Sequence, residues 1–114
     1  MKLSFSRKNE ETTHFLLMEG DLIGEEVGPR IVEFVTDALR EGAITYVLDL
    51  EKVRYISSSG LGLLITLLTK MKNAGGELVI VSPSEHVRKL LAITKLSGIF
   101  SIMDSMADFH QKNG

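Results

Sequence analysis

The chain has 114 residues, 44% of them hydrophobic, and a formal net charge of -2 at pH 7. This length suits a single hydrophobic core, so we expect residues 1–114 to form one domain. Charges of both signs are mixed along the chain without a concentrated basic face, which argues against nucleic acid as a partner. The chain contains no cysteine, which excludes disulfides and thiolate metal sites.

Two stretches bear on where the protein works. The first residues, MKLSFSRKNEETTH, lack the apolar core of a signal peptide. The longest apolar stretch, Leu61 to Leu68, is interrupted by Gly62 and Thr66 and is far shorter than the roughly 20 residues that a membrane-spanning helix needs. We therefore expect a cytoplasmic protein with no direct membrane insertion.

The first residues predict a β-hairpin. Apolar residues and serines alternate over residues 3–6, with the period of a strand that has one buried face. A second apolar run at 15–18 follows a polar turn at 9–13 and ends at Gly20. Two strands joined by this turn are the expected arrangement.

A helix and a buried strand are expected next. Apolar residues recur at helical spacing between Val27 and Ala38, behind two acidic residues that suit the first turn of a helix. Pro29 is expected in that first turn, where its missing N–H matters little, and Gly42 is expected to close the helix. The apolar, β-branched run at 43–50 then predicts a strand.

The remaining chain continues this alternation of helix and strand. The expected elements are a helix that begins within 58–60 and stops at 73–76, a strand at 77–82, a helix that starts at Ser84, a strand at 99–103 and a helix at 104–112. Alternating strands and helices with short links predict an α/β fold. Its sheet should be mostly parallel, with the N-terminal hairpin at one side and about four helices.

The helix that follows the serines has two different sides. At 100° per residue, five large apolar residues form the predicted core stripe: Leu61, Leu64, Ile65, Leu68 and Met71. The opposite side holds smaller or polar residues: Ser59, Gly62, Thr66, Thr69 and Lys70. Gly60 and Gly62 each cost about 1 kcal/mol relative to alanine inside a helix, so close approach by another surface is the expected reason for them.

The stretch Ser57, Ser58 and Ser59 allows two interpretations. A serine before a helix commonly caps it, because its hydroxyl accepts a hydrogen bond from a free N–H group of the first turn. The same place also suits a phosphate, since those N–H groups and the positive end of the helix dipole point toward it. Phosphorylation would add roughly -1.5 to -2 charges to a neutral surface and would disfavour a docked partner.

The segment from residue 47 to residue 100, VLDLEKVRYISSSGLGLLITLLTKMKNAGGELVIVSPSEHVRKLLAITKLSGIF, resembles the STAS domains of bacterial anti-sigma factor antagonists. In that family a strand of the VLDL type leads to a D-S-[ST]-G-L-G turn and a helix. A GGELVIV strand and a helix that ends before L-x-x-I-F follow. The order and spacing of these motifs match over nearly the whole chain.

The resemblance implies a fold and a function. The fold is a mostly parallel sheet wound with helices, and the function is binding and not catalysis, with no cofactor. Such antagonists bind an anti-sigma factor that is also a serine kinase and thereby release a sigma factor for transcription. Phosphorylation of the motif serine ends the binding, and a PP2C-like phosphatase reverses it.

Aligned on the motif, the phosphorylated serine corresponds to Ser58, the following Ser/Thr to Ser59, and the glycines to Gly60 and Gly62. The chain departs from the pattern at Ser57, where the family has aspartate, so Ser57 and Ser59 remain alternative modification sites. With the side of the helix that carries Thr66, these residues form the expected partner-binding surface.

Two acidic residues extend that expected surface. Asp49 matches an acid of the family pattern near the end of the preceding strand, and Asp21 sits in a GDL turn like another. Both residues could instead act as local caps or turn formers.

Catalysis by the serines is an alternative interpretation. Ser58 could be a nucleophile with His14, His86 or His110 as its base, but the G-x-S-x-G elbow is missing. A GLG turn also lacks the third glycine of a dinucleotide site, and its strand is expected to break at 52–54.

Two further alternatives concern a metal and a different partner. Asp49 and Glu51 share a strand face but have no histidine at ligand spacing, which argues against a metal site. STAS-like domains also serve as regulatory or scaffolding parts of membrane transport systems and stress-sensing assemblies. That role remains open for this chain.

Overall fold

A computed structural model describes residues 3–113. In chain order its elements are β1 (Ser4–Glu10), β2 (Thr13–Leu22), α1 (Gly24–Arg40), β3 (Thr45–Ile56), α2 (Ser58–Asn73), β4 (Glu77–Val81), α3 (Glu85–Ile93), a 3₁₀ turn η1 (Leu96–Gly98), β5 (Ser101–Met103) and α4 (Met106–Asn113). The strands lie in one sheet in the order β1-β2-β3-β4-β5. Only the β1–β2 hairpin is antiparallel among these strands, so the α/β prediction is confirmed.

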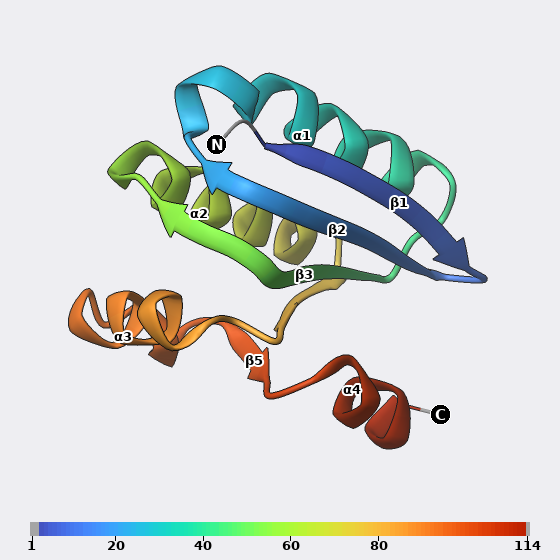
Figure 1. Cartoon of the computed structure of the whole chain (residues 1–114). Helices are drawn as coiled ribbons and strands as arrows, with labels where there is room; N and C mark the ends of the chain where they lie inside the picture. The colour runs from blue at the N-terminus through green and yellow to red at the C-terminus, as the bar shows by residue number, and fades with distance from the viewer. Residues whose placement is uncertain (1–2, 114) are drawn as a thin grey trace.

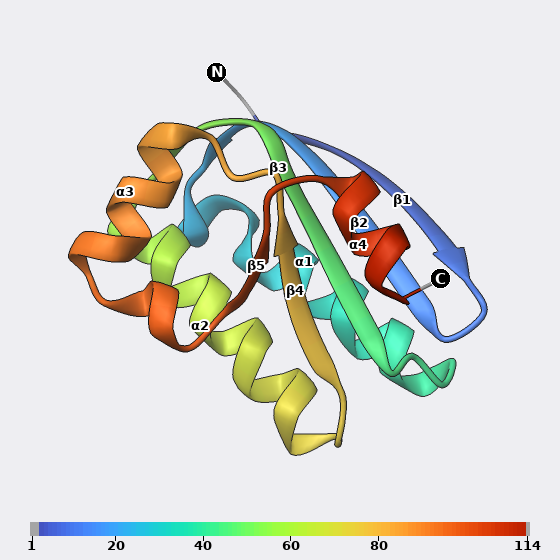
Figure 2. The same cartoon turned by 90° about the horizontal axis from the view of Figure 1, so that it is seen from below.

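Helices cover the two faces of the sheet unequally. α1 and α2 pack against one face and α4 lies against the other (Figures 1 and 2). The larger core includes Leu16, Leu48, Ile80 and Leu64 from β2, β3, β4 and α2, and α3 adds two buried residues to it. A smaller core lies under α4, where Phe109 packs against the opposite sheet face.

The strands are longer than their apolar runs predicted. The hairpin turn is confined to residues 11–12, because the polar residues on either side pair across the two strands. β3 does not break at 52–54 but continues to Ile56, since β2 remains its neighbour through register shifts at 17–19 and 20–21. Backbone pairing continues here although Lys52 and Arg54 are charged and exposed, and Val53 between them is buried in the core.

Pro29 does not lie in the first turn of α1. The helix begins at Gly24, so Pro29 is its sixth residue. The segment before Val27 joins the helix because Ile23 caps it through its backbone, and the N–H groups of Glu26 and Val27 donate to the Ile23 carbonyl at 3.1 and 3.3 Å. Proline at this depth removes the hydrogen bond that its N–H would have made to the carbonyl of Glu25.

The core-facing side of α2 is turned relative to the predicted stripe. Leu64, Leu68 and Met71 are buried as expected, but Ile65 is 38% exposed. Leu63 and Leu67, which the prediction left out, are buried instead. The apolar residues of this helix are too numerous for spacing alone to identify the buried ones.

Candidate functional site

The three serines lie where β3 passes into α2. β3 ends at Ile56 and α2 begins at Ser58, so Ser57 is the N-cap, in extended backbone with φ -77° and ψ 171°. The turn is fastened to the neighbouring strand, because the Ser57 N–H donates to the Leu22 carbonyl at 3.0 Å. The helix therefore begins within the predicted interval 58–60.

Ser57 is the capping serine. Its hydroxyl oxygen accepts a hydrogen bond from the Gly60 N–H at 3.0 Å, and it lies 3.4 Å from the Leu22 carbonyl oxygen, to which it can donate. These contacts supply one of the missing partners of the first helical turn. Ser57 is half-buried, so its hydroxyl is committed to holding the turn together.

Ser59 links α2 to α1. Its hydroxyl accepts a hydrogen bond from the Gly24 N–H at 3.0 Å, and its oxygen lies 2.8 Å from the Ser57 hydroxyl. At Gly24 the two backbones are so close that a Cβ would come within 2.2 Å of the Ser59 carbonyl oxygen. The N-terminus of α1 is thus held directly against that of α2.

Ser58 differs from both neighbours. It is exposed, and its hydroxyl forms no hydrogen bond with any residue in the described part of the chain. It is the first residue of α2, where the positive end of the helix dipole lies. Of the three serines, Ser58 presents a hydroxyl that another protein can reach without breaking an internal contact.

A carboxylate from α1 reaches this turn. A hydrogen bond from the Ser59 hydroxyl, together with the N–H group of Glu25 itself, lowers the pKa of Glu25 below its ordinary value. The hydroxyl groups therefore allow two arrangements of hydrogen bonds. In one, Ser57 donates to Ser59 and Ser59 donates to Glu25. In the other, Ser59 donates to Ser57 and Ser57 donates to the Leu22 carbonyl oxygen.

The two glycines of the motif have different environments. Gly60 is buried, and a Cβ there would lie 2.5 Å from the Leu22 carbonyl oxygen and 2.9 Å from Ile56 Cγ2. Its packing explains the glycine and removes it from the accessible surface on which it was expected. Gly62 is exposed, and a Cβ there would meet no atom within 4 Å.

Thr66 lies one turn after Gly62 on the exposed side of α2. Its hydroxyl donates to the Gly62 carbonyl at 3.0 Å, which leaves its methyl group and oxygen toward solvent. Ser58, Gly62, Ile65 and Thr66 are all exposed and uncharged. We call these four residues the neutral ridge.

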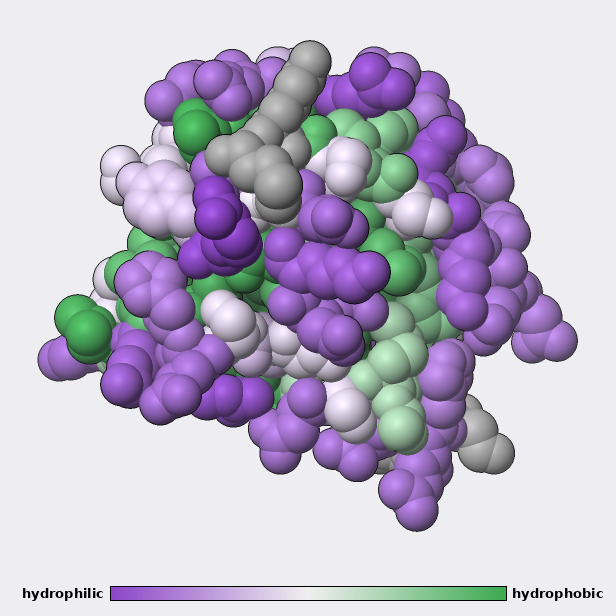
Figure 3. All heavy atoms as spheres, in the orientation of Figure 1, coloured by the Kyte–Doolittle hydropathy of each residue, from purple (hydrophilic) through white to green (hydrophobic). Residues whose placement is uncertain are grey.

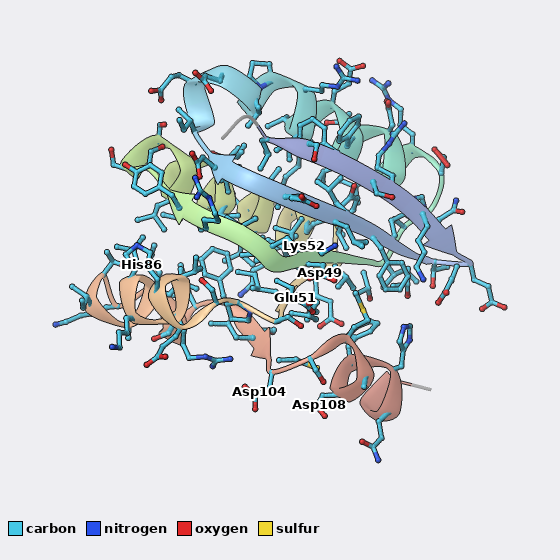
Figure 4. The ribbon with its side chains drawn as sticks, viewed as in Figure 1. Asp49, Glu51, Lys52, His86, Asp104 and Asp108 are labelled. Atoms are coloured by element: carbon cyan, nitrogen blue, oxygen red, sulfur yellow. The ribbon has the colours of Figure 1, made fainter. Side chains whose placement is uncertain are left out.

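Asp21 lies beside the serine turn, and Asp49 does not. Asp21 is not in a turn as expected but in β2, in register with Tyr55 of β3, and its Oδ1 is 3.5 Å from Arg54 Nη2. Asp49 lies in the middle of β3, where its carboxylate accepts from the Glu51 N–H at 3.0 Å (Figure 4). Ser57 lies eight positions after Asp49 in the chain, a span of about 26 Å along an extended strand.

The histidines and acids do not form a second chemical site at the serines. None of the hydrogen bonds among residues 3–113 joins a histidine to Ser58, and His14 is buried in a stack with Tyr46, with centroids 6.3 Å apart. His86 lies on α3 (Figure 4). The described residues include no group of three or more His, Cys, Asp or Glu side chains that could hold a metal ion.

Sequence reasoning missed Gly24 and Glu25 as parts of this site. They are separated from Ser59 by about 35 residues, and neither belongs to a motif around the serines. A glycine and an acid at the start of an amphipathic helix are ordinary residues there, so only the packing of α1 against α2 reveals their role.

No helix in the described part of the chain is long and apolar enough to cross a membrane. This finding agrees with the interruption of the 61–68 stretch by Gly62 and Thr66.

The family model of the STAS domain matches residues 11–109. The chain belongs to the STAS domain family. The match includes β2, the serine turn and every helix from α1 onward except the end of α4. Membership of the STAS family, which the serine motif indicated, is therefore confirmed.

Relatives extend over most of this STAS chain. The anti-sigma-B factor antagonist of Listeria monocytogenes is 26% identical over 113 residues, which cover 99% of both chains. A crystal structure from Thermotoga maritima, provisionally described as an anti-sigma factor antagonist, has a TM-score of 0.83 and 28% identity, and the match covers 95% of this chain and 92% of that one.

A more distant structure shares the fold. The anti-sigma factor antagonist SpoIIAA in its unphosphorylated form is 18% identical with a TM-score of 0.74, and the match covers 96% of each chain. The phosphorylated form of SpoIIAA from Bacillus has a TM-score of 0.72 at 17% identity, covering 97% of this chain and all of that one.

Proposed function

We propose that this protein is an anti-sigma factor antagonist whose binding surface is the neutral ridge and whose switch is Ser58. The observation that carries the proposal is that the three serines of the turn differ in their hydrogen bonds. Ser57 and Ser59 are held by internal hydrogen bonds, whereas the Ser58 hydroxyl is exposed and unengaged among the described residues.

The neutral ridge suits a partner that approaches closely. Gly62 places no side chain on the surface, and no contact within the described chain requires a glycine there. A helix tolerates the loss of about 1 kcal/mol at such a position when a partner backbone needs the space. Asp21 borders the same end of the sheet and is a candidate contact at the rim.

The partner proposed here is an anti-sigma factor with serine kinase activity. Binding would occupy that factor and release its sigma factor for transcription. The name of the Listeria relative and the membership in the STAS family support the antagonist role. The role is binding, and no chemical step is assigned to the serines.

Phosphorylation of Ser58 would act on the partner and not on the fold. The phosphate would add roughly -1.5 to -2 charges and three acceptor oxygens to an uncharged surface. The start of α2 accommodates the anion through its dipole and its remaining N–H groups, while a docked partner would have to desolvate it. SpoIIAA keeps the same fold in its phosphorylated form, which supports an effect of phosphorylation on the partner and not on the fold.

The serine at position 57 does not prevent this switch. The family motif has aspartate there, and in this chain the Ser57 hydroxyl fills the capping role that an aspartate side chain could also fill. Glu25 supplies a carboxylate on the α1 side of the turn. A PP2C-like phosphatase would restore the unmodified state.

Binding of Ser58 variants to an anti-sigma factor with serine kinase activity from the same organism tests the proposal. Ser58→Asp should lower the affinity at least about 100-fold, because it places a charge in a desolvated contact, while the melting temperature stays nearly unchanged. Ser58→Ala should bind as the parent does and should continue to bind after incubation with the kinase and ATP. Calorimetry and thermal unfolding measure both properties.

Ser97→Asp is the matched control, since Ser97 is an exposed serine in η1, outside the neutral ridge. It should bind like the parent. If Ser58→Asp binds as tightly as the parent, the switch assignment is wrong. Co-purification with a membrane transport ATPase in place of a soluble kinase would favour the transport role.

A further inference from the structure

Two methionines near the C-terminus are more exposed than the other methionines that the structure describes. The chain has five methionines and no cysteine, so thioethers are its only sulfur groups. Met18 and Met71 are buried in the larger core, at 3% and 0% exposed. Met103 and Met106 are half-buried. Within the described residues, these two are therefore the thioethers that a dissolved oxidant can reach without unfolding the chain.

Both half-buried thioethers pack against the smaller core under α4. Met103 is the last residue of β5, and Met106 is the first residue of α4. The core that they contact has five buried residues, all with hydrocarbon side chains: Phe15, Val47, Val79, Val81 and Phe109. Figure 3 shows hydrophobic surface between the sheet and α4, bordered by hydrophilic residues. The two methionines thus have solvent on one side and hydrocarbon on the other.

In the described part of α4, one buried side chain holds the helix to the sheet. Phe109 is the only buried residue among residues 106–111, and its ring centroid lies 5.9 Å from that of Phe15. The exposed His110 ring lies 5.8 Å from the same ring. An eight-residue helix is not stable alone in water. α4 therefore depends on these contacts and on those of Met106 to stay folded in place.

The strand before α4 has its own attachment to the domain. The Met103 carbonyl accepts a hydrogen bond from the Ser82 N–H at 3.0 Å, and Met103 pairs with Val81 of β4. Asp104 forms an ion pair with Arg88 of α3 at 2.9 Å. β5 can therefore remain in the sheet when α4 leaves it.

Hydrogen peroxide converts an accessible thioether to a sulfoxide. The sulfur attacks one peroxide oxygen, the S–O bond forms as the O–O bond breaks, and the second oxygen leaves with both protons as water. The methionine is oxidised by two electrons and the peroxide is reduced. The sulfoxide oxygen accepts hydrogen bonds, but the five buried core residues have no side-chain donor for it. It must keep water as its partner, which draws the side chain away from the core.

We propose that Met103 and Met106 are a peroxide-sensitive modification site, and that their oxidation releases α4 from the sheet. The larger core stays closed, because α1 and α2 pack against the opposite sheet face (Figures 1 and 2). Methionine sulfoxide reductases return the sulfoxide to the thioether, so the release is reversible. This inference does not rest on the binding proposed for the neutral ridge, which belongs to α2.

Peptide mass spectrometry and hydrogen exchange of the full-length protein test the proposal. With limiting hydrogen peroxide, sulfoxide should form at Met103 and Met106 at least about 10-fold faster than at Met18 and Met71. Amide exchange in α4 should then be at least about 10-fold faster than in the untreated protein, while exchange in α1 and α2 changes less than about twofold. Treatment with methionine sulfoxide reductases A and B should restore the slow exchange.

Variants separate the sulfur chemistry from the packing. Met103→Leu combined with Met106→Leu keeps a similar volume and cannot form a sulfoxide, so α4 should stay protected after the same peroxide treatment. Met103→Gln combined with Met106→Gln places an uncharged polar group at both positions, and its α4 should exchange rapidly without peroxide. Met18→Leu is the matched control, and it should respond to peroxide as the parent does.

Any one of four results would overturn the proposal. The first is that sulfoxide forms at Met18 or Met71 before it forms at Met103 and Met106. The second is that Met103 and Met106 are oxidised while exchange in α4 stays unchanged. The third is that peroxide accelerates α4 exchange in the leucine double variant as it does in the parent. The fourth is an equal acceleration in α1, α2 and α4, which would mean that oxidation destabilises the whole domain instead of releasing one helix.

Discussion

The three adjacent serines differ in what each hydroxyl does, although their side chains are identical. Ser57 caps α2, Ser59 joins α2 to α1, and Ser58 faces solvent. The sequence predicted a cap and a modification site in this turn, and the resemblance to the family favoured Ser58 for modification. The assignment of caps required the actual helix start, because a shift of one residue would exchange the three roles.

Alanine substitution should distinguish Ser57 from Ser58 by its effect on stability. Ser57→Ala should lower the free energy of unfolding by about 1 kcal/mol because it removes the N-cap. Ser58→Ala should change it by less than about 0.5 kcal/mol, since the side chain is exposed and unengaged. Urea unfolding measures both. A loss at Ser58 equal to that at Ser57 would show that Ser58 has a structural contact.

The glycines of the motif form a second matched pair. Gly60→Ala should destabilise the protein by about 2 kcal/mol, because its methyl group would have to displace the backbone at Leu22. Gly62→Ala should instead stabilise it by about 0.5–1 kcal/mol, since the added methyl group meets open space and favours the helix. Chemical denaturation of both variants measures the difference.

Binding provides the independent measurement for this pair. If the anti-sigma factor approaches α2 closely, Gly62→Ala should weaken binding although it stabilises the fold. A Gly62→Ala variant that is more stable and binds normally would show that the neutral ridge is not the contact surface.

At the scale of elements, the contact between α1 and α2 was not predictable from local sequence. The spacing of apolar residues indicated both helices, but not that their N-termini meet at Gly24 and Ser59. The apolar runs also underestimated β1, β2 and β3, because an edge strand and a strand end can pair through the backbone while their side chains stay polar. Helix caps such as Ser84, whose hydroxyl accepts from the Val87 N–H at 3.2 Å, were predictable from sequence.

The Ser59–Glu25 contact predicts a change in titration. Because the hydrogen bond from Ser59 favours the carboxylate form, Ser59→Ala should raise the pKa of Glu25 toward its ordinary value of 4.5. A lowered pKa in the folded state means that this contribution to stability is present above the unfolded pKa and is lost as the pH falls through the folded one. Carboxyl NMR titration measures the shift.

Ser58→Ala serves as the control for this titration, since it leaves the contact in place. The Glu25 titration should be unchanged in that variant. An unchanged titration in Ser59→Ala would mean that the Ser59 hydroxyl donates instead to Ser57 and that Ser57 donates to the Leu22 carbonyl.

On the scale of the whole molecule, the alternation of strands and helices predicted the layers and the parallel sheet. It did not predict which face each helix covers. The C-terminal helix, whose sequence pattern is weak, proves to cover a second core with Phe109, Phe15, Val47, Val79 and Val81. Its partners are residues that the strand patterns identified only as buried, without assigning them to a face.

Disruption of this second core should lower the free energy of unfolding of the entire domain. Phe109 is 3% exposed and packs edge-on against Phe15 with centroids 5.9 Å apart. Phe109→Ala should lower the free energy of unfolding by about 3 kcal/mol. Hydrogen exchange should accelerate most in α4 and β5, whereas α1 and α2 stay comparatively protected. A change below about 1 kcal/mol would show that α4 packs only loosely.

The backbone contact at Gly24 restricts how this chain can vary. When a larger side chain is introduced into a protein interior, a smaller neighbouring side chain can usually relieve the steric clash. At Gly24 the clash would be with the backbone carbonyl group of Ser59, which every amino acid possesses. No compensating substitution at position 59 can make room. Genetic selection for suppressors of a Gly24→Val defect should therefore yield true revertants, or distant changes that merely raise stability, and no partner mutation at the point of collision.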